Sequence, residues 1–115
     1  MEKKVEVSML CQLYGKLLTE KQYEFIDDYY NNDLSLSEIA ENNDITRQAV
    51  RDNLKKGENK LFEYEEKLGF MKKEVKQEEM IDDILLSIEK IEETIQNKET
   101  LKLFKDVKEK LNKIV

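Results

Sequence analysis

Two short helical patterns separated by a polar break, over residues 34–54, constrain the fold of this chain more than any other feature. Ser35 is followed three residues later by Glu38, which predicts a capping box at the start of the first helix. Thr46 is placed to cap the second helix. Between them, Asn42-Asn43-Asp44 supplies residues that tolerate the left-handed backbone of a sharp turn. This pattern predicts a helix-turn-helix, whose usual ligand is the major groove of DNA.

The apolar residues of the same stretch are spaced as the inner faces of two crossing helices require. Ala40 is small enough for the two helices to approach closely. We therefore expect burial at the crossing of Ile39, Ala40, Ile45, Val50 and Leu54.

Composition points to an all-α protein. The 115 residues include no proline and only three glycines, and 40% are charged, so many helix faces must be solvated. This length suggests one domain, or one small domain with an extension.

Two helices are expected before the helix-turn-helix. The first covers about residues 5–18, with a face formed by Val5, Met9, Leu13 and Leu17. The second starts at the capping box Thr19–Gln22 and ends near residue 31 or 32. Four tyrosines of this region could stack on bases, but their spacing beside apolar residues favours the core for Tyr14, Tyr23, Tyr29 and Tyr30.

The helix that follows Thr46 is expected to run to Leu68, where Gly69 ends it. Gly57 interrupts this helix at a cost of about 1 kcal/mol relative to alanine. It either permits the close approach of a phosphate or a partner helix, or is a tolerated surface glycine.

After Gly69 the apolar spacing alternates between three and four, as in coiled coils. The stripe consists of Ile81, Ile84, Ile88, Ile91 and Ile95. Asn97 offers a break and a cap before a last amphipathic helix. Residues 1–69 are thus expected to form the helix-turn-helix domain, and residues 70–115 a helical hairpin and dimerisation region. The hairpin can pack against the core, against a second protomer or against both, and we favour a homodimer.

The second helix of the motif carries a basic, amide-rich face. Residues 47–60 hold five cations against two carboxylates, in a chain of net charge −6. The functional interpretation assigns base contacts to Thr46, Arg47, Gln48 and Arg51, and phosphate contacts to Lys55, Lys56 and Lys60. The alternative interpretation is an ordinary solvated helix face.

Other classes of function have little support in the sequence. The chain has no histidine and no glycine-rich phosphate loop, so we expect no enzyme activity, no metal site and no cofactor. Cys11 is a single cysteine in an apolar context, which predicts a buried structural thiol. With no long apolar span or signal peptide, we expect a cytoplasmic protein that does not insert into membranes.

Several phrases resemble the YlxM family of small bacterial helix-turn-helix proteins, over about residues 10–70. The matching phrases are Leu17–Gln22 with Tyr29-Tyr30, Leu34–Ala40, Thr46–Lys55 and Tyr64–Gly69. That family is in turn similar to region four of bacterial sigma factors, which reads promoter DNA through the same helix pair. The resemblance implies an all-α, sigma-region-four-like bundle with a role in transcription regulation, and a link with the signal recognition particle pathway.

The turn departs from such motifs at two positions. Asp44 stands where glycine is frequent, and Asn43 stands where leucine is usual. Both residues tolerate the left-handed conformation, so we expect the turn to survive, slightly loosened by the lost apolar contact.

Together these patterns predict a DNA-binding regulatory protein of the helix-turn-helix type. A role in the signal recognition particle pathway is what the family resemblance adds to this prediction. The competing hypothesis is a protein- or RNA-interaction module of that system, with a sigma-like fold that does not read DNA. The acidity of the chain favours this alternative, and the cations of the second helix oppose it.

Overall fold

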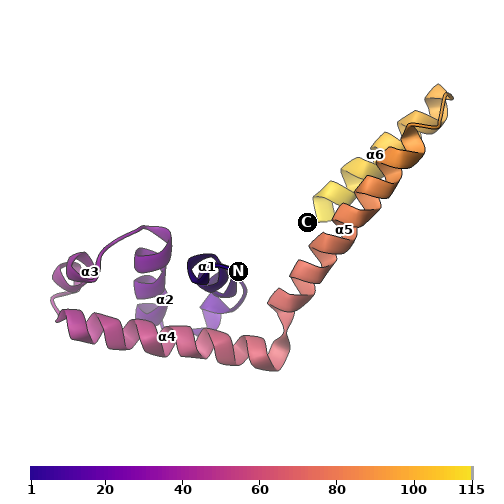
Figure 1. Ribbon diagram of the computed structural model, residues 1–115. Helices are drawn as coiled ribbons and strands as arrows, with labels where there is room; N and C mark the ends of the chain where they lie inside the picture. Colours follow the sequence, from indigo (N-terminus) through magenta and orange to yellow (C-terminus); the bar gives the residue numbers. More distant parts are fainter. Residues whose placement is uncertain (115) are drawn as a thin grey trace. The chain divides into compact units, whose positions relative to one another are not determined.

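The computed structural model describes residues 1–114. Within them all the regular secondary structure is helical, and the chain divides into two compact units, Met1–Met71 and the segment from Lys72 onward (Figure 1). The helices are α1 (Lys3–Tyr14), α2 (Glu20–Ile26), α3 (Leu36–Asn43), α4 (Arg47–Leu68), α5 (Phe70–Glu92) and α6 (Lys98–Ile114). A 3₁₀ turn, η1 (Gly15–Leu17), follows α1, and a π-helical turn, η2 (Asp27–Asn31), follows α2. The predicted all-α helix-turn-helix fold is confirmed.

The predicted helix starts are confirmed by their caps. The Thr19 and Ser35 hydroxyls accept hydrogen bonds from the backbone N–H groups of Gln22 and Glu38, whose side chains accept in return from the capping residues. The Thr46 hydroxyl accepts from the Ala49 N–H at 3.0 Å. These bonds satisfy backbone donors that the first turn of a helix leaves free, and so fix where α2, α3 and α4 begin.

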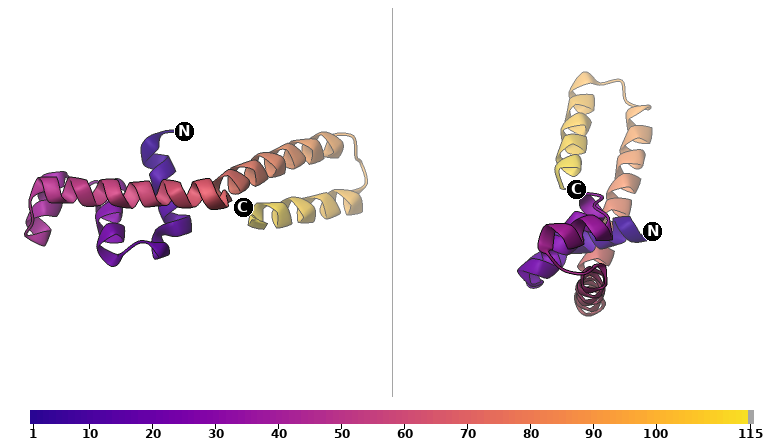
Figure 2. Two further views of the ribbon diagram at one scale, coloured as in Figure 1. Left: turned by 90° about the horizontal axis from the view of Figure 1, so that it is seen from below. Right: turned by 90° about the vertical axis from the view of Figure 1, so that its left-hand side faces the viewer.

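In the first unit, α1, α2 and α3 all pack against α4, the longest helix of this unit (Figures 1 and 2). The core at these contacts is apolar and includes Val7, Leu10, Cys11, Tyr14, Leu18, Phe25, Ile26, Tyr30, Ile39, Ala40, Val50, Leu54 and Leu61. Cys11 is buried as expected, and burial raises the pKa of its thiol.

Three expectations about burial need correction. The buried face of α1 consists of Val7, Leu10, Cys11 and Tyr14 instead of Val5, Met9, Leu13 and Leu17. Both sets have helical spacing, so periodicity alone cannot choose between them.

Tyr14 and Tyr30 are in the core, but Tyr23 and Tyr29 are exposed. Ile45 is 37% exposed, because the turn holds it outside the crossing of α3 and α4.

The turn between α3 and α4 has the predicted left-handed residue. Asp44 has φ 54° and ψ 46°, and the next N–H, of Ile45, donates to the Ala40 carbonyl at 3.1 Å. Such a bond satisfies one of the carbonyls that a helix end leaves free. The turn therefore closes without glycine.

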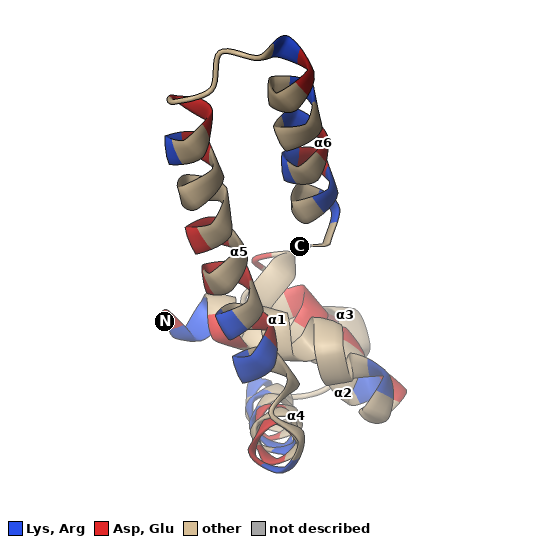
Figure 3. Ribbon diagram, turned by 90° about the vertical axis from the view of Figure 1, so that its right-hand side faces the viewer, with Lys and Arg blue, Asp and Glu red and all other residues tan. Residues whose placement is uncertain are grey.

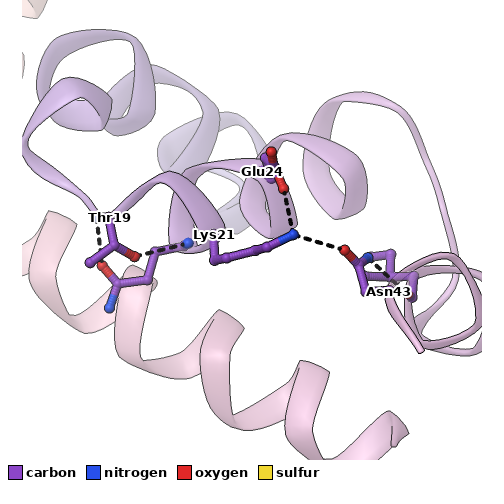
Figure 4. A network of polar contacts seen from close by, with 6 residues as sticks. Thr19, Lys21, Glu24 and Asn43 are labelled. Carbon is purple, nitrogen blue, oxygen red and sulfur yellow. Dashed lines mark hydrogen bonds and ion pairs between the residues drawn. The ribbon is translucent and has the colours of Figure 1, made fainter. Parts of the chain in front are cut away.

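Asn43 compensates for the missing leucine with hydrogen bonds. Its amide nitrogen donates to the Ile39 carbonyl at 2.8 Å, and its amide oxygen accepts from the Lys21 ammonium at 3.3 Å. Lys21 also pairs with Glu24 at 3.3 Å, so the end of α3 is tied to α2 (Figure 4). A polar link thus replaces the apolar contact that we expected to be lost.

The first unit ends just beyond the glycine that ends α4. Gly69 is left-handed (φ 66°), and α5 begins at the next residue. The Phe70 ring stacks on the Tyr14 ring with centroids 6.2 Å apart, and the Phe70 N–H donates to the Tyr14 hydroxyl at 3.2 Å. The Met71 N–H donates to the Glu65 carboxylate at 2.9 Å. Phe70 and Met71 therefore belong to the packing of the first unit.

The second unit is a hairpin of α5 and α6, which run antiparallel (Figure 2). Asn97 caps α6, as predicted, by accepting from the N–H groups of Glu99 and Thr100. An ion pair of 2.6 Å between Glu92 and Lys108 joins the two helices.

Candidate nucleic-acid interface

The N-terminal turn of α4 opens onto a concave surface that encloses a volume of about 650 Å³. Its lining comes from the start of α4, the start of α3 and the turn η2, and comprises Tyr29, Ser35, Leu36, Ser37, Thr46, Arg47, Gln48 and Arg51. Only two of these residues are charged, and both are arginines. The structure thus brings together on one surface the four residues to which the sequence assigns base contacts, Thr46, Arg47, Gln48 and Arg51.

The geometry of α4 divides the seven predicted contact residues into two groups. At 3.6 residues per turn, Gln48, Arg51 and Lys55 lie within about 100° of Arg47 around the helix axis. Lys56 and Lys60 lie about 140–180° from Arg47, on the other side of α4. All of these side chains are exposed. A single groove in contact with Arg47 and Arg51 would therefore also reach Gln48 and Lys55, but not Lys56 and Lys60.

The Gln48 side chain is already held by a neighbour. Its amide nitrogen donates to the Asp52 carboxylate at 3.0 Å, one turn along α4. This bond fixes the direction of the amide and leaves its oxygen available to an incoming donor. Asp52 is the nearest carboxylate in sequence to the arginine face, and one of its oxygens accepts this bond from Gln48.

Further along α4, the basic face borders a carboxylate that is largely buried. A second concave surface, which encloses a volume of about 340 Å³, lies beside Arg51 and Lys55. Its other lining residues are Lys3, Tyr29, Tyr30, Leu36, Leu54 and Glu58. The Tyr30 hydroxyl donates to Glu58, and the Lys3 ammonium lies 3.9 Å from its other carboxylate oxygen. Burial raises the pKa of Glu58, and the charge of Lys3 opposes that shift.

Tyr29 and Lys3 were missed in the sequence as components of this surface. The spacing predicts that Tyr29 lies in the core, and this prediction holds only if a regular α-helix continues through residue 31. The π-helical turn places Tyr30 in the core and leaves Tyr29 exposed beside α3 and α4. Adjacent residues of a helix lie about 100° apart and can both be buried, as Leu10 and Cys11 are, so the sequence carried no local signal that only Tyr30 would be.

The five isoleucines assigned to dimerisation lie in the second unit, in different environments. Ile81 and Ile88 are buried in the hairpin, and Ile95 is half-buried beyond the end of α5. Ile84 is 40% exposed and Ile91 is 45% exposed. The isoleucine stripe therefore serves the contact with α6 on one side and remains uncovered on the other.

Two other kinds of functional feature are absent from residues 1–114. No group of three or more cysteine, aspartate or glutamate side chains in this range is arranged to hold a metal ion. None of the helices in the same range combines the length and apolarity that crossing a membrane requires.

Comparisons with known proteins agree with this architecture. Residues 1–102 match the family model described as "Putative helix-turn-helix protein, YlxM / p13 like". A UPF0122 protein of Acetivibrio thermocellus is 43% identical over 115 residues, which cover 100% of this chain and 98% of the relative. A UPF0122 protein of Clostridium botulinum is 42% identical over 111 residues, which cover 96% of this chain and all of the relative.

A relative from Fusobacterium nucleatum is 51% identical over 76 residues, which cover 64% of this chain and 74% of that protein. The resemblance stated from the sequence is thereby confirmed. The chain belongs to the UPF0122 family of YlxM/p13-like helix-turn-helix proteins.

Proposed function

We propose that the first unit binds duplex DNA through the N-terminal turns of α4 and acts as a regulatory protein. One observation carries the proposal. The net charge of the chain is −6, but no carboxylate is among the residues that line the concave surface at the start of α4. The starts of α3 and α4 contribute to this lining two arginines, a glutamine and three side chains with a hydroxyl group. Such a surface matches the acceptors of base edges and phosphates.

Four residues that line this surface, together with Lys55 one turn beyond Arg51, have assigned roles in the proposed complex. Arg47 and Arg51 donate to guanine acceptors or to phosphates, and Gln48 pairs with adenine. Thr46 contributes contacts at the helix start, and Lys55 neutralises a phosphate. The sequence also predicts phosphate contacts for Lys56 and Lys60. Because they lie on the other side of α4, the interface proposed here does not include them.

The proposed activity is binding and not catalysis. Two finer parts of the proposal rest on the family resemblance: transcription regulation and a place in the signal recognition particle pathway. The cytoplasmic location expected from the sequence is also part of the proposal. The second candidate is a protein- or RNA-interaction module of that pathway. It is favoured by the acidity of the chain outside α4, since residues 1–35 carry seven carboxylates against four cations.

An unbiased selection distinguishes these candidates. The whole protein is incubated with random pools of duplex DNA and of RNA, and the bound molecules are sequenced over several rounds. The DNA proposal expects an enriched duplex motif whose enrichment is lost in the Arg47→Ala/Arg51→Ala variant. Enrichment in the RNA pool alone, or in neither pool, contradicts DNA binding and points to the second candidate.

We also propose that the hairpin joins two copies of this chain. Exposed apolar side chains form one stripe on each helix: Met80, Ile84 and Ile91 on α5, and Leu103, Val107 and Ile114 on α6. Seen along each helix from its N-terminus to its C-terminus, the exposed stripe is rotated by about a quarter turn from the face that contacts the other helix. The direction of this rotation is the same on both helices. Since the helices are antiparallel, both stripes face the same side of the hairpin. A continuous exposed apolar strip is a feature of interaction sites.

Charge favours a second copy as the occupant of this strip. Residues 78–93 of the hairpin hold seven carboxylates and one lysine, whereas residues 98–113 hold six lysines and three carboxylates. Charges of both signs follow the two helices in Figure 3. A two-fold arrangement that sets α5 of one copy beside α6 of the other brings the acidic helix to the basic one.

A further inference from the structure

Tyr29 is the residue that links three concave surfaces around the start of α4. It lines the surface with Arg47 and Arg51, the surface with Arg51 and Lys55, and a third of about 460 Å³ with Lys3 and Lys4. Its position results from the π-helical turn η2, and such turns are frequent at functional sites. Tyr29 therefore lies at the border between the arginine surface and the N-terminal end of α1.

The ring of Tyr29 is held in place while its hydroxyl is available. The ring makes an edge-on contact with Tyr30, with centroids 5.1 Å apart and planes at 85°. Tyr30 is itself fixed, because it is buried and its hydroxyl donates to Glu58. Within the described part of the chain, the Tyr29 hydroxyl has no hydrogen-bond partner, and the residue is 38% exposed. A positioned phenol with a free O–H is a ready donor to an anion.

Carboxylates near Tyr29 are numerous, but each has a partner. Asp27 accepts from the Asn31 amide at 2.8 Å, and Asp28 accepts from the Asn32 amide at 3.3 Å. Asp33 pairs with Lys4, and Glu58 has Tyr30 and Lys3. On the side of α4, the charged neighbours of Tyr29 include Arg51 and Lys55. Because the amide partners of Asp27 and Asp28 are neutral, an anion reaches Tyr29 from the side of Arg51 and Lys55 and not from the side of these carboxylates.

We propose that the Tyr29 hydroxyl donates a hydrogen bond to a backbone phosphate of the DNA, at the edge of the groove that α4 enters. This inference rests on the proposed DNA binding and extends the interface from α4 to the turn η2. The contact is with a phosphate, so it contributes affinity and orientation but no base preference.

The test compares two tyrosines of similar exposure by removing only their hydroxyl oxygens. Tyr29→Phe keeps the ring contact with Tyr30, and Tyr23→Phe is the matched control, because Tyr23 is 43% exposed but lies beside Gly15 and Cys11, away from α4's arginines. Binding of each full-length variant to the selected duplex is measured by fluorescence anisotropy. A hydrogen bond to a charged group predicts about tenfold weaker binding for Tyr29→Phe and no change for Tyr23→Phe.

A second measurement locates the phosphate. Ethylation of individual phosphates in the duplex should reveal one position that weakens the wild-type protein but no longer affects Tyr29→Phe. Equal affinities of wild type and Tyr29→Phe, with identical ethylation patterns, overturn the Tyr29 contact and leave the DNA proposal intact. A wild-type protein that binds no duplex overturns both. Thermal melting of the two variants should match that of the wild type, since neither hydroxyl bonds to a described residue.

Discussion

Gly57 of α4 lies directly against Ile26 of α2, so close that a Cβ atom at residue 57 would come 2.7 Å from the Ile26 Cδ1 atom. Both residues are buried, and Ile26 has no exposed surface into which it could turn. The sequence left open whether Gly57 serves a close approach or is a tolerated surface residue. The structure shows a close approach, between two helices of the same chain.

Gly57→Ala should therefore destabilise the protein although alanine is the better helix former. The gain in helix propensity is about 1 kcal/mol, and the strain of inserting a methyl group into a packed core is about 1–3 kcal/mol. We expect a net loss of up to about 2 kcal/mol in the free energy of unfolding, measured by urea denaturation. Ile26→Val removes the Cδ1 atom and should relieve the clash, so the double variant should be more stable than the sum of the single effects predicts. Strict additivity would contradict this account.

Asp44 provides a test of the turn. Its backbone is left-handed, with φ 54°. Asp44→Gly should be neutral or slightly stabilising, since glycine adopts this conformation without a steric penalty. Asp44→Val should lower the melting temperature clearly, because a β-branched residue is strained there. Asp33 has the same φ and can be changed in the same way to test whether the response is general. A valine variant at residue 44 that melts like the wild type would show that the conformation is not required.

The residues that mark helix ends were the best predicted part of this fold. These residues act through hydrogen bonds and backbone angles within a few positions, so their effect can be predicted from the local sequence. They are Thr19, Ser35, Asp44, Thr46 and Gly69. The arginine face of α4 followed from one of these boundaries, because the position of Thr46 fixes which residues form the first exposed turns.

The errors concern properties that depend on packing between distant segments. Which face of α1 is buried depends on where α4 lies, and two helical stripes in its sequence satisfy the same periodicity. Tyr29 was misplaced because a π-helical turn shifts the register by about one residue relative to an α-helix, and no local residue type announces it. That shift is also what added Tyr29 to the candidate interface.

Glu58 should make stability depend on pH in an unusual direction. Burial raises the pKa of this carboxyl in the folded protein above its ordinary value, so the folded state holds the proton more tightly than the unfolded state. The contribution of Glu58 to the free energy of unfolding should then fall as the pH rises from the ordinary carboxyl range through the raised pKa. Glu58→Gln should remove this slope and be at least as stable as the wild type at neutral pH. Chemical denaturation at several pH values measures both. An unchanged pH profile in the variant would show that Glu58 is not its source.

The hairpin proposal predicts that one exposed apolar residue of α5 matters and another does not. Ile91→Glu should convert a dimer to a monomer in sedimentation equilibrium at micromolar concentration, because the interface would have to bury an unpaired charge. Leu86 is the matched control: it is more exposed than Ile91 but lies about 140° away around α5, outside the proposed strip. Leu86→Glu should remain dimeric.

Ile88→Glu is less informative, since Ile88 is buried in the hairpin and its change should unfold the unit. A wild-type protein that is monomeric under these conditions rules out the dimer.

The proposed DNA complex predicts different effects for three kinds of residue on α4. Arg47→Ala and Gln48→Ala should relax the base preference, each by about 1–3 kcal/mol of discrimination between the selected duplex and its mismatched forms. Lys55→Ala should instead weaken binding to all duplexes and lower the slope of log affinity against log salt by about one unit.

Lys60→Ala is the control that the geometry of α4 supplies. It removes the same charge as Lys55→Ala from the same helix, but from the side away from Arg47. If binding arose from the general positive charge of this helix, the two lysine variants would be equally weak. If α4 enters a groove with its Arg47–Lys55 side, Lys60→Ala should retain the wild-type salt slope. Titrations of the selected duplex at four or more salt concentrations distinguish these outcomes, and equal slopes for Lys55→Ala and Lys60→Ala would refute the orientation of α4 proposed here.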